Sequence, residues 1–313
     1  MTRLHALWDS TRMQLLVALA RHQSLSGAAR AIGISQSAAS EHLSLLERAA
    51  GERLTVRTGH GLQLTEVGHV LAAHAAHALA SLEAGEQHLS SRADLSTGTL
   101  RLGASPVPGI YILPEILAEF ADAYPGIQLT LTVSSTQQVL SDLVAGRVQL
   151  AIICSNVEDE RITLQPLMDD QIVGVTRPGR LDLDGGTIPA QRLSGQALLV
   201  QEPGSSTRRF ATDVLPAQGA KWKYVWELGS IEAVKRAARK GLGVGFLSRH
   251  TVMEECRRGE LATFQVSGVS PLLGNVSIAR LASVPYSPAA QQFSRVAAAR
   301  VTAGQPLLAV TSC

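Results

Sequence analysis

The chain has 313 residues, a mass of 33.1 kDa and a formal net charge of +2 at pH 7, and this length predicts two or three domains with their own cores. It has no stretch of about 18 uncharged apolar residues and no N-terminal basic segment followed by an apolar run. We therefore expect a cytoplasmic protein without a membrane span or a secretory leader. Cys154, Cys256 and Cys313 are too widely spaced for a disulfide framework or a zinc site and are expected to be free thiols, with a redox sensor as the alternative.

Two short helices joined by a tight turn are predicted between Ser24 and Gly51. Gly33 supplies the turn, and Ser35 can cap the second helix by accepting a backbone hydrogen bond. The first helix has small residues that permit close packing, and the second has an inward face at helical spacing, formed by Ala39, Leu43 and Leu46. This pattern is typical of a helix-turn-helix that reads DNA, and an ordinary helical hairpin is the alternative.

The polar side chains that would enter the major groove lie at the start of the second helix: Ser35, Gln36, Ser37, Ser40 and Glu41. Gln36 can form two hydrogen bonds with adenine, and Ser37 and Ser40 can contact base edges or phosphates. Glu41 could accept a hydrogen bond from cytosine, or it could be repelled by phosphates and face elsewhere. We therefore expect Gln36 to make the main base contact.

The stretch Gly51–Gly68 alternates short β-prone runs around the turn Thr58–Gly61, as expected for the wing of a winged helix. Arg53 and Arg57 would reach phosphates, and His60 at the tip could enter the minor groove. Residues 1–65 hold seven arginines and four acidic residues, an excess of +3, against −1 for the remainder. Because this excess is modest, a dimer or a larger assembly should be needed to bind DNA firmly.

These segments resemble the N-terminal domain of the LysR-type transcriptional regulators. The matching positions share one register and are Ser24, Ala28, Ala29, Ser35, Gln36, Ser40, Leu46, Glu47, Gly51, Arg57, Leu64, Thr65 and Gly68. Two positions depart from the family's pattern, because Thr55 stands where the family usually has phenylalanine and Ser37 where it often has proline. Neither departure removes the motif.

A long helix without proline is predicted from Thr65 to about Arg92. Small and apolar residues recur along it at alternating steps of four and three, at Leu64, Gly68, Leu71, Ala75, Ala78, Leu82, Gly85 and Leu89. Such a seam predicts pairing with the same helix of a second copy, and the resemblance implies the same dimerisation. His74 and His77 could share a face, but no carboxylate or cysteine completes a ligand set, so we expect no metal and no cofactor.

Beyond a short polar break, strands and helices alternate, which predicts parallel sheets. The first series has strands at 100–104, 127–133 and 150–153 and helices at 110–123 and 137–145. The second has strands at 172–175, 198–200, 224–228 and 244–247, a helix after residue 206 and another at 231–240. A strand near 276–279 and a helix at 288–301 should return to the first lobe. Two lobes joined by two crossings form a hinge that can close on a ligand.

Ligands of open α/β sheets bind at the carboxyl ends of the strands, so the polar residues there are candidate effector contacts. In the first lobe these are Ser105, Ser134, Ser135, Thr136, Ser155 and Asn156. In the second lobe they are Ser230 and the run 202–208, with Gly204, Ser205, Thr207 and Arg208. Amides and hydroxyls before a helix, with the fixed charge of an arginine, suit a small anion such as a carboxylate or a phosphate. Each hydroxyl could instead simply cap a helix.

This half resembles the effector-binding domain of LysR-type regulators, itself similar to periplasmic solute-binding proteins, in segments such as LRLGAS, LVAGRVQLAI and GSIEAVKRAARKGLGVGFL. The run EPGSSTRR is similar to a segment of the subgroup that includes regulators of Calvin-cycle operons and of sulfur assimilation. Gln149 departs from the family, which commonly has aspartate there.

The predicted fold class is α/β, with an N-terminal winged helix-turn-helix at 1–65 and a linker and dimerisation helix at 66–93. A two-lobed effector-binding domain like a periplasmic binding protein follows at 94–303, and a tail at 304–313. Lobe I would hold about 98–168 and 271–303, and lobe II about 169–270.

The predicted function is that of a LysR-type transcriptional regulator. Its partners would be an interrupted palindromic DNA operator, a small anionic effector, further copies of the chain in a homodimer or homotetramer, and RNA polymerase. The alternative is an α/β enzyme, or a solute-binding protein, with an N-terminal helical oligomerisation module. The sequence gives that alternative little support, because it lacks phosphate-loop, GxSxG and HExxH motifs, and the glycine cluster Gly241–Gly245 precedes a strand. We therefore do not expect an enzyme.

Overall fold

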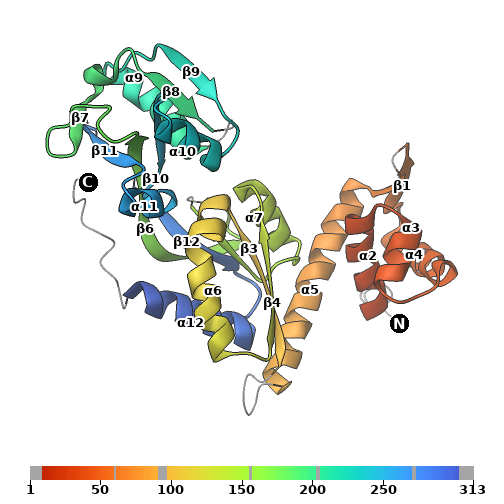
Figure 1. Ribbon diagram of the computed structural model, residues 1–313. Coiled ribbons are helices and arrows are strands. Elements are labelled where there is room, and N and C mark those ends of the chain that lie inside the picture. The colour runs from red at the N-terminus through yellow and green to blue at the C-terminus, as the bar shows by residue number, and fades with distance from the viewer. Residues whose placement is uncertain are drawn as a thin grey trace.

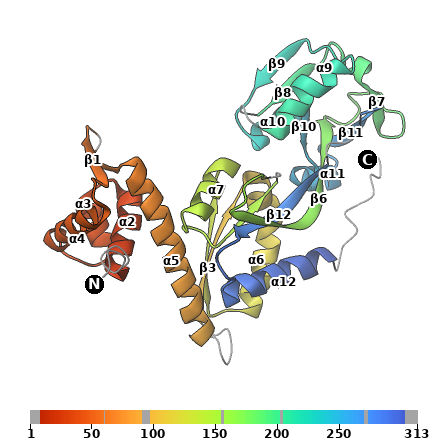
Figure 2. The same ribbon diagram turned by 180° about the vertical axis from the view of Figure 1, so that it is seen from behind.

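The structure, a computed structural model, describes residues 9–59, 61–90, 97–154, 157–201, 205–269 and 273–302. Three parts follow one another in space, as Figures 1 and 2 show: an N-terminal helical domain, a middle α/β lobe and an outer α/β lobe. The helix α5 (Glu66–Ser90) leaves the N-terminal domain and runs along the middle lobe. No helix in the described ranges is long and apolar enough to cross a membrane.

The N-terminal domain consists of α2 (Ser10–His22), α3 (Leu25–Ala31), α4 (Gln36–Ala50), β1 (Thr55–Thr58) and β2 (Gly61–Leu64). Each of its helices is capped at its N-terminus by a side chain that accepts a hydrogen bond from a backbone nitrogen of the first turn, and these side chains are Asp9, Ser24 and Ser35. Gly33 turns the chain between α3 and α4 with a φ of 73°, which glycine adopts without strain. The predicted helix-turn-helix and the two-stranded wing are both confirmed.

Glu47 of α4 binds the segment that leads into the wing. Its carboxylate accepts hydrogen bonds from the backbone nitrogens of Leu54 and Thr55, at 3.0 and 3.3 Å, and from Arg53 Nη1 at 3.0 Å. Helix α5 then approaches the same strand so closely that a Cβ at Gly68 would lie 2.2 Å from the carbonyl oxygen of Leu54. Only glycine fits there, so the wing, α4 and α5 form one unit.

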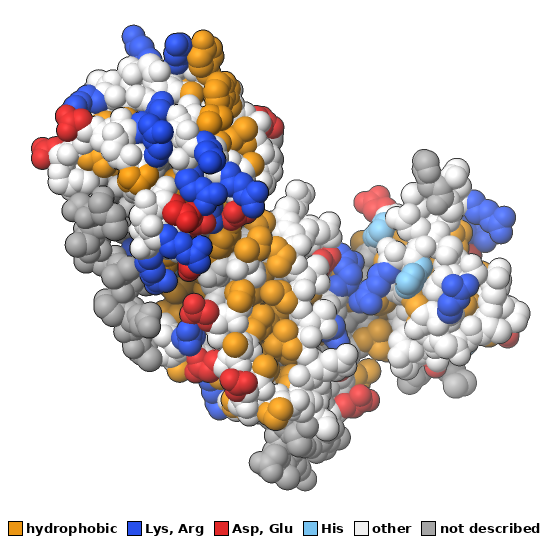
Figure 3. Space-filling model, in the orientation of Figure 1, with side chains coloured by type: hydrophobic (Ala, Val, Ile, Leu, Met, Phe, Trp, Pro, Cys, Tyr) orange, Lys and Arg blue, Asp and Glu red, His pale blue; other side chains and the backbone are white. Residues whose placement is uncertain are grey.

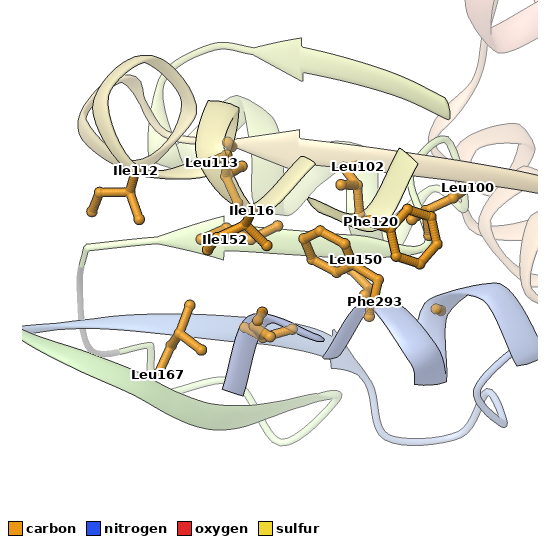
Figure 4. Packing of buried hydrophobic residues seen from close by; sticks show 14 of the residues in the cluster. Leu100, Leu102, Ile112, Leu113, Ile116, Phe120, Leu150, Ile152, Leu167 and Phe293 are labelled. Carbon is orange, nitrogen blue, oxygen red and sulfur yellow. The ribbon is translucent and has the colours of Figure 1, made fainter. Parts of the chain in front are cut away.

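The middle lobe, called lobe I from here on, is built on the strand order β4-β3-β5-β12-β6. Its strands are β3 (Gly98–Ala104), β4 (Ile127–Val133), β5 (Leu150–Ile153), β12 (Leu273–Leu281) and the first part of β6 (Ile162–Thr176). Its helices are η1 (Pro108–Ile112), α6 (Leu113–Ala123), α7 (Thr136–Val144) and α12 (Pro288–Thr302). Figure 4 shows the core, where Phe120 of α6 and Phe293 of α12 pack over Leu100, Leu102 and Leu150 of the sheet.

The outer lobe, lobe II, continues the same sheet in the order β6-β10-β8-β9, and β11 pairs with β6 on one side and with β7 on the other. Its strands are β7 (Thr187–Pro189), β8 (Ala197–Val200), β9 (Tyr224–Glu227), β10 (Val244–Ser248) and β11 (Ala262–Ser267). Its helices are η2 (Ala190–Leu193), α8 (Ser206–Arg209), η3 (Phe210–Val214), α9 (Leu215–Ala217), α10 (Ile231–Arg239), η4 (Arg249–Thr251) and α11 (Met253–Arg257). Its core gathers around Phe246, which meets the edges of Phe210 and Phe264.

Strand β6 corrects the expectation of a strand beginning at residue 172, because it begins ten residues earlier, at Ile162. Up to Gln171 it pairs with β12 in lobe I, and from Ile172 onward it pairs with β10 in lobe II. Pro166 lies where the register with β12 shifts, a position that a strand allows proline because a ladder hydrogen bond is already missing there. That proline, with two consecutive aspartates later in the strand, hid it from the hydrophobic pattern. Strands β7 and β11 were also not predicted.

Helix α5 confirms the predicted long helix, but several residues of the predicted seam pack against other parts of the same chain and not against a second copy. Leu64, Gly68 and Ala75 are buried against the chain's own residues, whereas Val70 and Leu82 are 53% and 56% exposed. The far half of α5 is fixed to lobe I, because Glu83 accepts two hydrogen bonds from Arg101, at 2.9 and 2.8 Å. The expectation that the whole seam faces a partner is therefore wrong for those three positions.

Candidate DNA-binding and effector-binding sites

Helix α4 presents a polar face to solvent and an apolar face to the domain core. Ala39, Leu43 and Leu46 are buried, and the predicted DNA-contacting residues Gln36, Ser37, Ser40 and Glu41 are exposed. Ser35 is partly committed to structure, because its Oγ accepts a hydrogen bond from Ala38 N at 3.1 Å and lies 2.9 Å from Ser37 Oγ. The exposed face is free to enter a groove without disturbing the core.

Two further residues of that face were missed from the sequence. Ser44 and Arg48 are exposed and follow Ser40 at four-residue steps, with Arg48 Nε donating to the Ser44 carbonyl at 3.4 Å. Helical spacing from Ser37 onward was the signal that could have found them. They extend the exposed polar stripe to the end of α4.

The wing presents Arg57 and Arg53 differently. Arg57 is exposed on β1 and forms no ion pair among the described residues, so its charge is available to an anion. Arg53 is 84% exposed but pairs with Glu47 at 3.0 Å, which leaves part of its guanidinium for solvent or phosphate. The predicted contact His60 lies outside the described residues.

At the carboxyl ends of the lobe I strands, Ser105 is the buried candidate. It is 4% exposed, and its Oγ has no nitrogen or oxygen partner among the described residues, but it lies beside the thiol of Cys154. Burial, and then the carboxylate of Asp170, raise the pKa of Cys154 to about 12. The thiol is therefore protonated at neutral pH and poorly suited to redox sensing. Ser155 and Asn156 fall outside the described residues.

Two of the predicted hydroxyls cap helices. Ser135 Oγ accepts from Gln138 N at 3.3 Å at the start of α7, and Ser230 Oγ accepts from Ala233 N at 3.2 Å at the start of α10. Thr136 occupies the first turn of α7 and is half-buried. These hydroxyls satisfy helix ends while remaining close to the ends of their sheets.

The segment before α8 brings three predicted residues together in lobe II. Ser205 Oγ lies 2.7 Å from Thr207 Oγ1, and Arg208 Nη1 donates to Glu227 at 2.7 Å and to the carbonyl of Gln201 at 2.9 Å. Gln201 Nε2 also donates to Thr207 at 3.3 Å. The result is a cluster of donors with one half-exposed carboxylate, and Gly204 lies outside the described residues.

A buried polar cluster at the start of lobe II was not predicted. Ser248 Oγ donates to Asp170 at 2.8 Å, and the ring of His250 lies 3.8 Å from the same carboxylate. Burial raises the pKa of Asp170 and lowers that of His250, and each opposes the shift of the other. Ser248 ends β10, so extending that strand by one residue would have identified it as a strand-end hydroxyl.

A second unpredicted cluster connects the two lobes. Tyr111 of lobe I donates its hydroxyl to Glu232 of α10 at 2.7 Å. Lys235 lies 2.8 Å from Glu232 and 2.7 Å from Glu255, with its Nζ 5.0 Å from the centre of the Tyr111 ring. We call these four residues the interlobe clasp. Tyr111 lies in η1, a π-helical turn of a kind that often marks functional positions.

Nothing in the described part of the chain groups three or more metal-ligating side chains as a metal site requires. His77, one of the two histidines considered for that role, instead lies with its Nε2 2.5 Å from the carbonyl oxygen of Val144 in lobe I. That contact helps to hold α5 on the lobe.

Comparison with known proteins settles the family. The family model for the bacterial regulatory helix-turn-helix protein of the lysR family matches residues 10–69, and that for the LysR substrate binding domain matches residues 93–302. The chain belongs to the LysR family of transcriptional regulators. The predicted α/β fold class and the predicted regulatory function are thereby confirmed, and the effector-binding domain is the larger part of the chain.

Similar proteins span nearly the whole chain. The transcriptional regulator CbbR of Rhodospirillum rubrum is 31% identical over 265 residues, which are 85% of this chain and 88% of that protein. A full-length OxyR variant from Pseudomonas aeruginosa shares the fold, with a TM-score of 0.75, 21% identity and coverage of 92% of this chain and 93% of that one. The CcmR regulatory domain of Synechocystis PCC6803, solved in complex with 2-PG, is 30% identical, with a TM-score of 0.58 and coverage of 65% and 97%.

Proposed function

We propose that this LysR-family regulator binds an interrupted palindromic operator through paired winged helices and responds to a small anionic effector between its lobes. The polar face of α4, with Gln36, Ser37, Ser40 and Glu41, would read bases, while Ser35 holds the helix start. Arg53, Arg57 and His60 would contact the DNA backbone and minor groove. The observation that carries the DNA part is the separation of faces on α4, where every predicted contact is exposed and Ala39, Leu43 and Leu46 are not.

The effector part is supported by the donor cluster of Ser205, Thr207 and Arg208, in which Arg208 pairs with one carboxylate of the described residues, Glu227, itself 50% exposed. An incoming anion could replace that carboxylate on the guanidinium, and phosphates and carboxylates both bind arginine through two hydrogen bonds. Ser105, Ser135, Thr136, Ser155, Gly204 and Ser230 complete the proposed set. The CcmR regulatory domain, which is 30% identical to this chain and was solved in complex with 2-PG, favours a phosphorylated acid.

Exposed apolar residues support assembly into a homodimer or homotetramer. The sheet ends in two edge strands, β4 and β9, and β9 exposes Tyr224, Val225 and Trp226 by 52%, 51% and 38%. Val70 and Leu82 of α5 are exposed large apolar residues in the part of the helix whose side chains are described. We assign residues 66–93 to a linker and dimerisation helix between a DNA-binding domain at 1–65 and an effector domain at 94–303. The proposal includes no catalytic step, and it places the protein with the chromosome in the cytoplasm.

The test is footprinting of the purified chain on DNA upstream of its own gene, across a salt series, with 2-phosphoglycolate, 3-phosphoglycerate, phosphoenolpyruvate or sulfate. We expect protection of an interrupted palindrome, and one phosphorylated acid should change its pattern. Arg208→Gln should abolish that change and leave the basal footprint. A footprint that no anion alters, or one that Arg208→Gln leaves responsive, would contradict the effector assignment. Absence of any protected site would contradict the DNA assignment.

A further inference from the structure

A cavity lies between the N-terminal domain and lobe I, and none of its lining residues belongs to lobe II. Its volume is about 560 Å³, and its walls come from α2, α5 and the end of α7. Most of its lining is apolar, including Val17 and Ala20 of α2, Ala72 of α5, and Leu140 and Val144 of α7. The cavity is therefore a place where one ligand could touch both domains.

Three arginines lie near one another here: Arg147 lines the cavity, and Arg21, which follows the lining residue Ala20 in α2, interacts electrostatically with Arg147 and Arg101. Figure 3 shows blue side chains in the crevice between the N-terminal domain and lobe I. Arg101 is neutralised by Glu83, through two hydrogen bonds, and Arg147 by Asp142, to which its Nε donates at 2.7 Å. Arg21, in the last turn of α2, forms no ion pair among the described residues.

The surroundings of Arg21 disfavour its positive charge. Its pKa is lowered, first by burial and then by repulsion from Arg147 and Arg101, while the attraction of Asp142 only partly offsets this. The other charged residues that line the cavity, Asp159 and Arg161, pair with each other at 2.7 Å. An exposed guanidinium without an ion pair among the described residues, that of Arg21, therefore lies next to a mostly apolar cavity, one residue beyond the lining residue Ala20.

We propose that this crevice is a second ligand site, distinct from the site between the lobes, and that it binds a small organic anion with an apolar body. The oxyanion would accept hydrogen bonds from Arg21 and from the remaining donors of Arg147. The apolar body would fill the space against Val17, Ala72 and Val144. A phosphate or carboxylate head on an aromatic or aliphatic body meets both requirements.

Such a ligand would couple the two domains. Because Arg21 belongs to the DNA-binding domain and Arg147 to lobe I, an anion held by both stabilises the docked arrangement by its own binding free energy. DNA that requires a different domain arrangement, in which the contacts of Glu83 and His77 of α5 with lobe I are broken, would then bind less tightly in its presence. The regulator would thus respond to a second metabolite without a second effector domain.

Isothermal titration calorimetry of the full chain with phenyl phosphate and with inorganic phosphate tests the site. We expect phenyl phosphate to bind more tightly than inorganic phosphate, because only the former fills the apolar part. Arg21→Gln should weaken phenyl phosphate roughly tenfold or more, as loss of a charged hydrogen-bond donor does. Arg30→Gln, an equal charge change at an exposed residue of α3, should leave the affinity unchanged.

Two further variants keep the outcome decisive. Ser141 is an exposed residue of the cavity lining, so Ser141→Phe should fill the cavity without touching a core and should also abolish binding. In the Arg208→Gln variant, which removes the anion contact proposed between the lobes, phenyl phosphate should still bind at the crevice, and adding Arg21→Gln should still weaken it, which separates the two sites. The proposal is wrong if Arg208→Gln weakens the ligand and Arg21→Gln does not, if Ser141→Phe has no effect, or if phenyl phosphate does not bind.

Discussion

Lys235 should be the residue on which the stability of lobe II depends most strongly among its charged side chains. Its side chain is only 6% exposed, and it lies between Glu255, which is 18% exposed, and Glu232, which is 54% exposed. Glu255 Oε2 is buried without a hydrogen-bond partner among the described residues, so Lys235 supplies much of the compensation for that carboxylate. Replacing the lysine by methionine roughly preserves the length of the side chain and removes its charge.

The expected loss is about 3 kcal/mol, the lower end of the range for removing one partner of a buried ion pair, because Glu255 is left uncompensated. The contact with Glu232 should add at most about 1 kcal/mol, since an exposed carboxylate is well solvated. Adding Glu255→Gln to Lys235→Met removes the orphaned charge. The double variant should therefore be more stable than the single variant, although it has lost more of the native contacts.

Urea unfolding followed by tryptophan fluorescence measures this loss selectively. Two of the three tryptophans, Trp222 and Trp226, belong to lobe II, and Trp8→Phe in every variant removes the third. The transition reports lobe II even where the whole chain does not unfold in one step. A loss below about 1 kcal/mol for Lys235→Met, or a double variant less stable than the single one, would refute the assignment of Lys235 as the counter-ion of a buried carboxylate.

Three further outcomes are expected. Gln36→Ala should relax the preference for one base pair by about 1–3 kcal/mol. Arg57→Ala should weaken binding to specific and random DNA alike and reduce the slope of log affinity against log salt concentration by about one. Equal losses of affinity for both variants on both DNAs would contradict these roles. Hydrogen bonds from Arg101 hold the pKa of Glu83 below its usual 4.5. The stabilisation of the folded state by this ion pair should therefore be complete at neutral pH, and it should be lost as the pH falls from 4.5 through the pKa that Glu83 has in the folded protein. Wild type and Glu83→Gln should then differ in unfolding midpoint at pH 7 but converge in acid, and a constant difference would argue against the linkage. Trp226→Glu should shift sedimentation towards smaller assemblies, and an unchanged profile would exclude β9 from the interface.

The N-terminal domain could be predicted from its sequence because its determinants are local. Ser24 and Ser35 cap the helices that immediately follow them, and Gly33 provides the turn between those helices. The outward face of α4 follows from helical spacing alone. Each of these features depends on residues that follow one another within about one helical turn, so no knowledge of the remaining chain is required.

The clusters of the effector domain could not be predicted because they join distant parts of the chain. Ser248 and Asp170 meet across the pairing of β10 with β6, and Tyr111 meets Glu232 across the two lobes. Arg208 was expected to supply a fixed positive charge, and its ion pair with Glu227 could not be foreseen because Glu227 comes from β9, which lies beside β8 only in the folded sheet. The heptad seam on α5 was misassigned for a similar reason, since a helix packed on its own chain requires the same small residues as one packed on a second copy.

The attachment of α5 restricts how an effector can act. The contacts that hold this helix, from Glu83 to Arg101 and from His77 to Val144, are made to lobe I, so the DNA-binding domain is carried by lobe I. Lobe II is joined to lobe I by β6, β12 and the interlobe clasp. Closure of the lobes within one copy would move lobe II but leave α4 unmoved relative to lobe I. A closing effector can therefore reorient the recognition helices only if lobe II contacts a neighbouring copy, and the exposed strand β9 is the surface that we propose for such a contact.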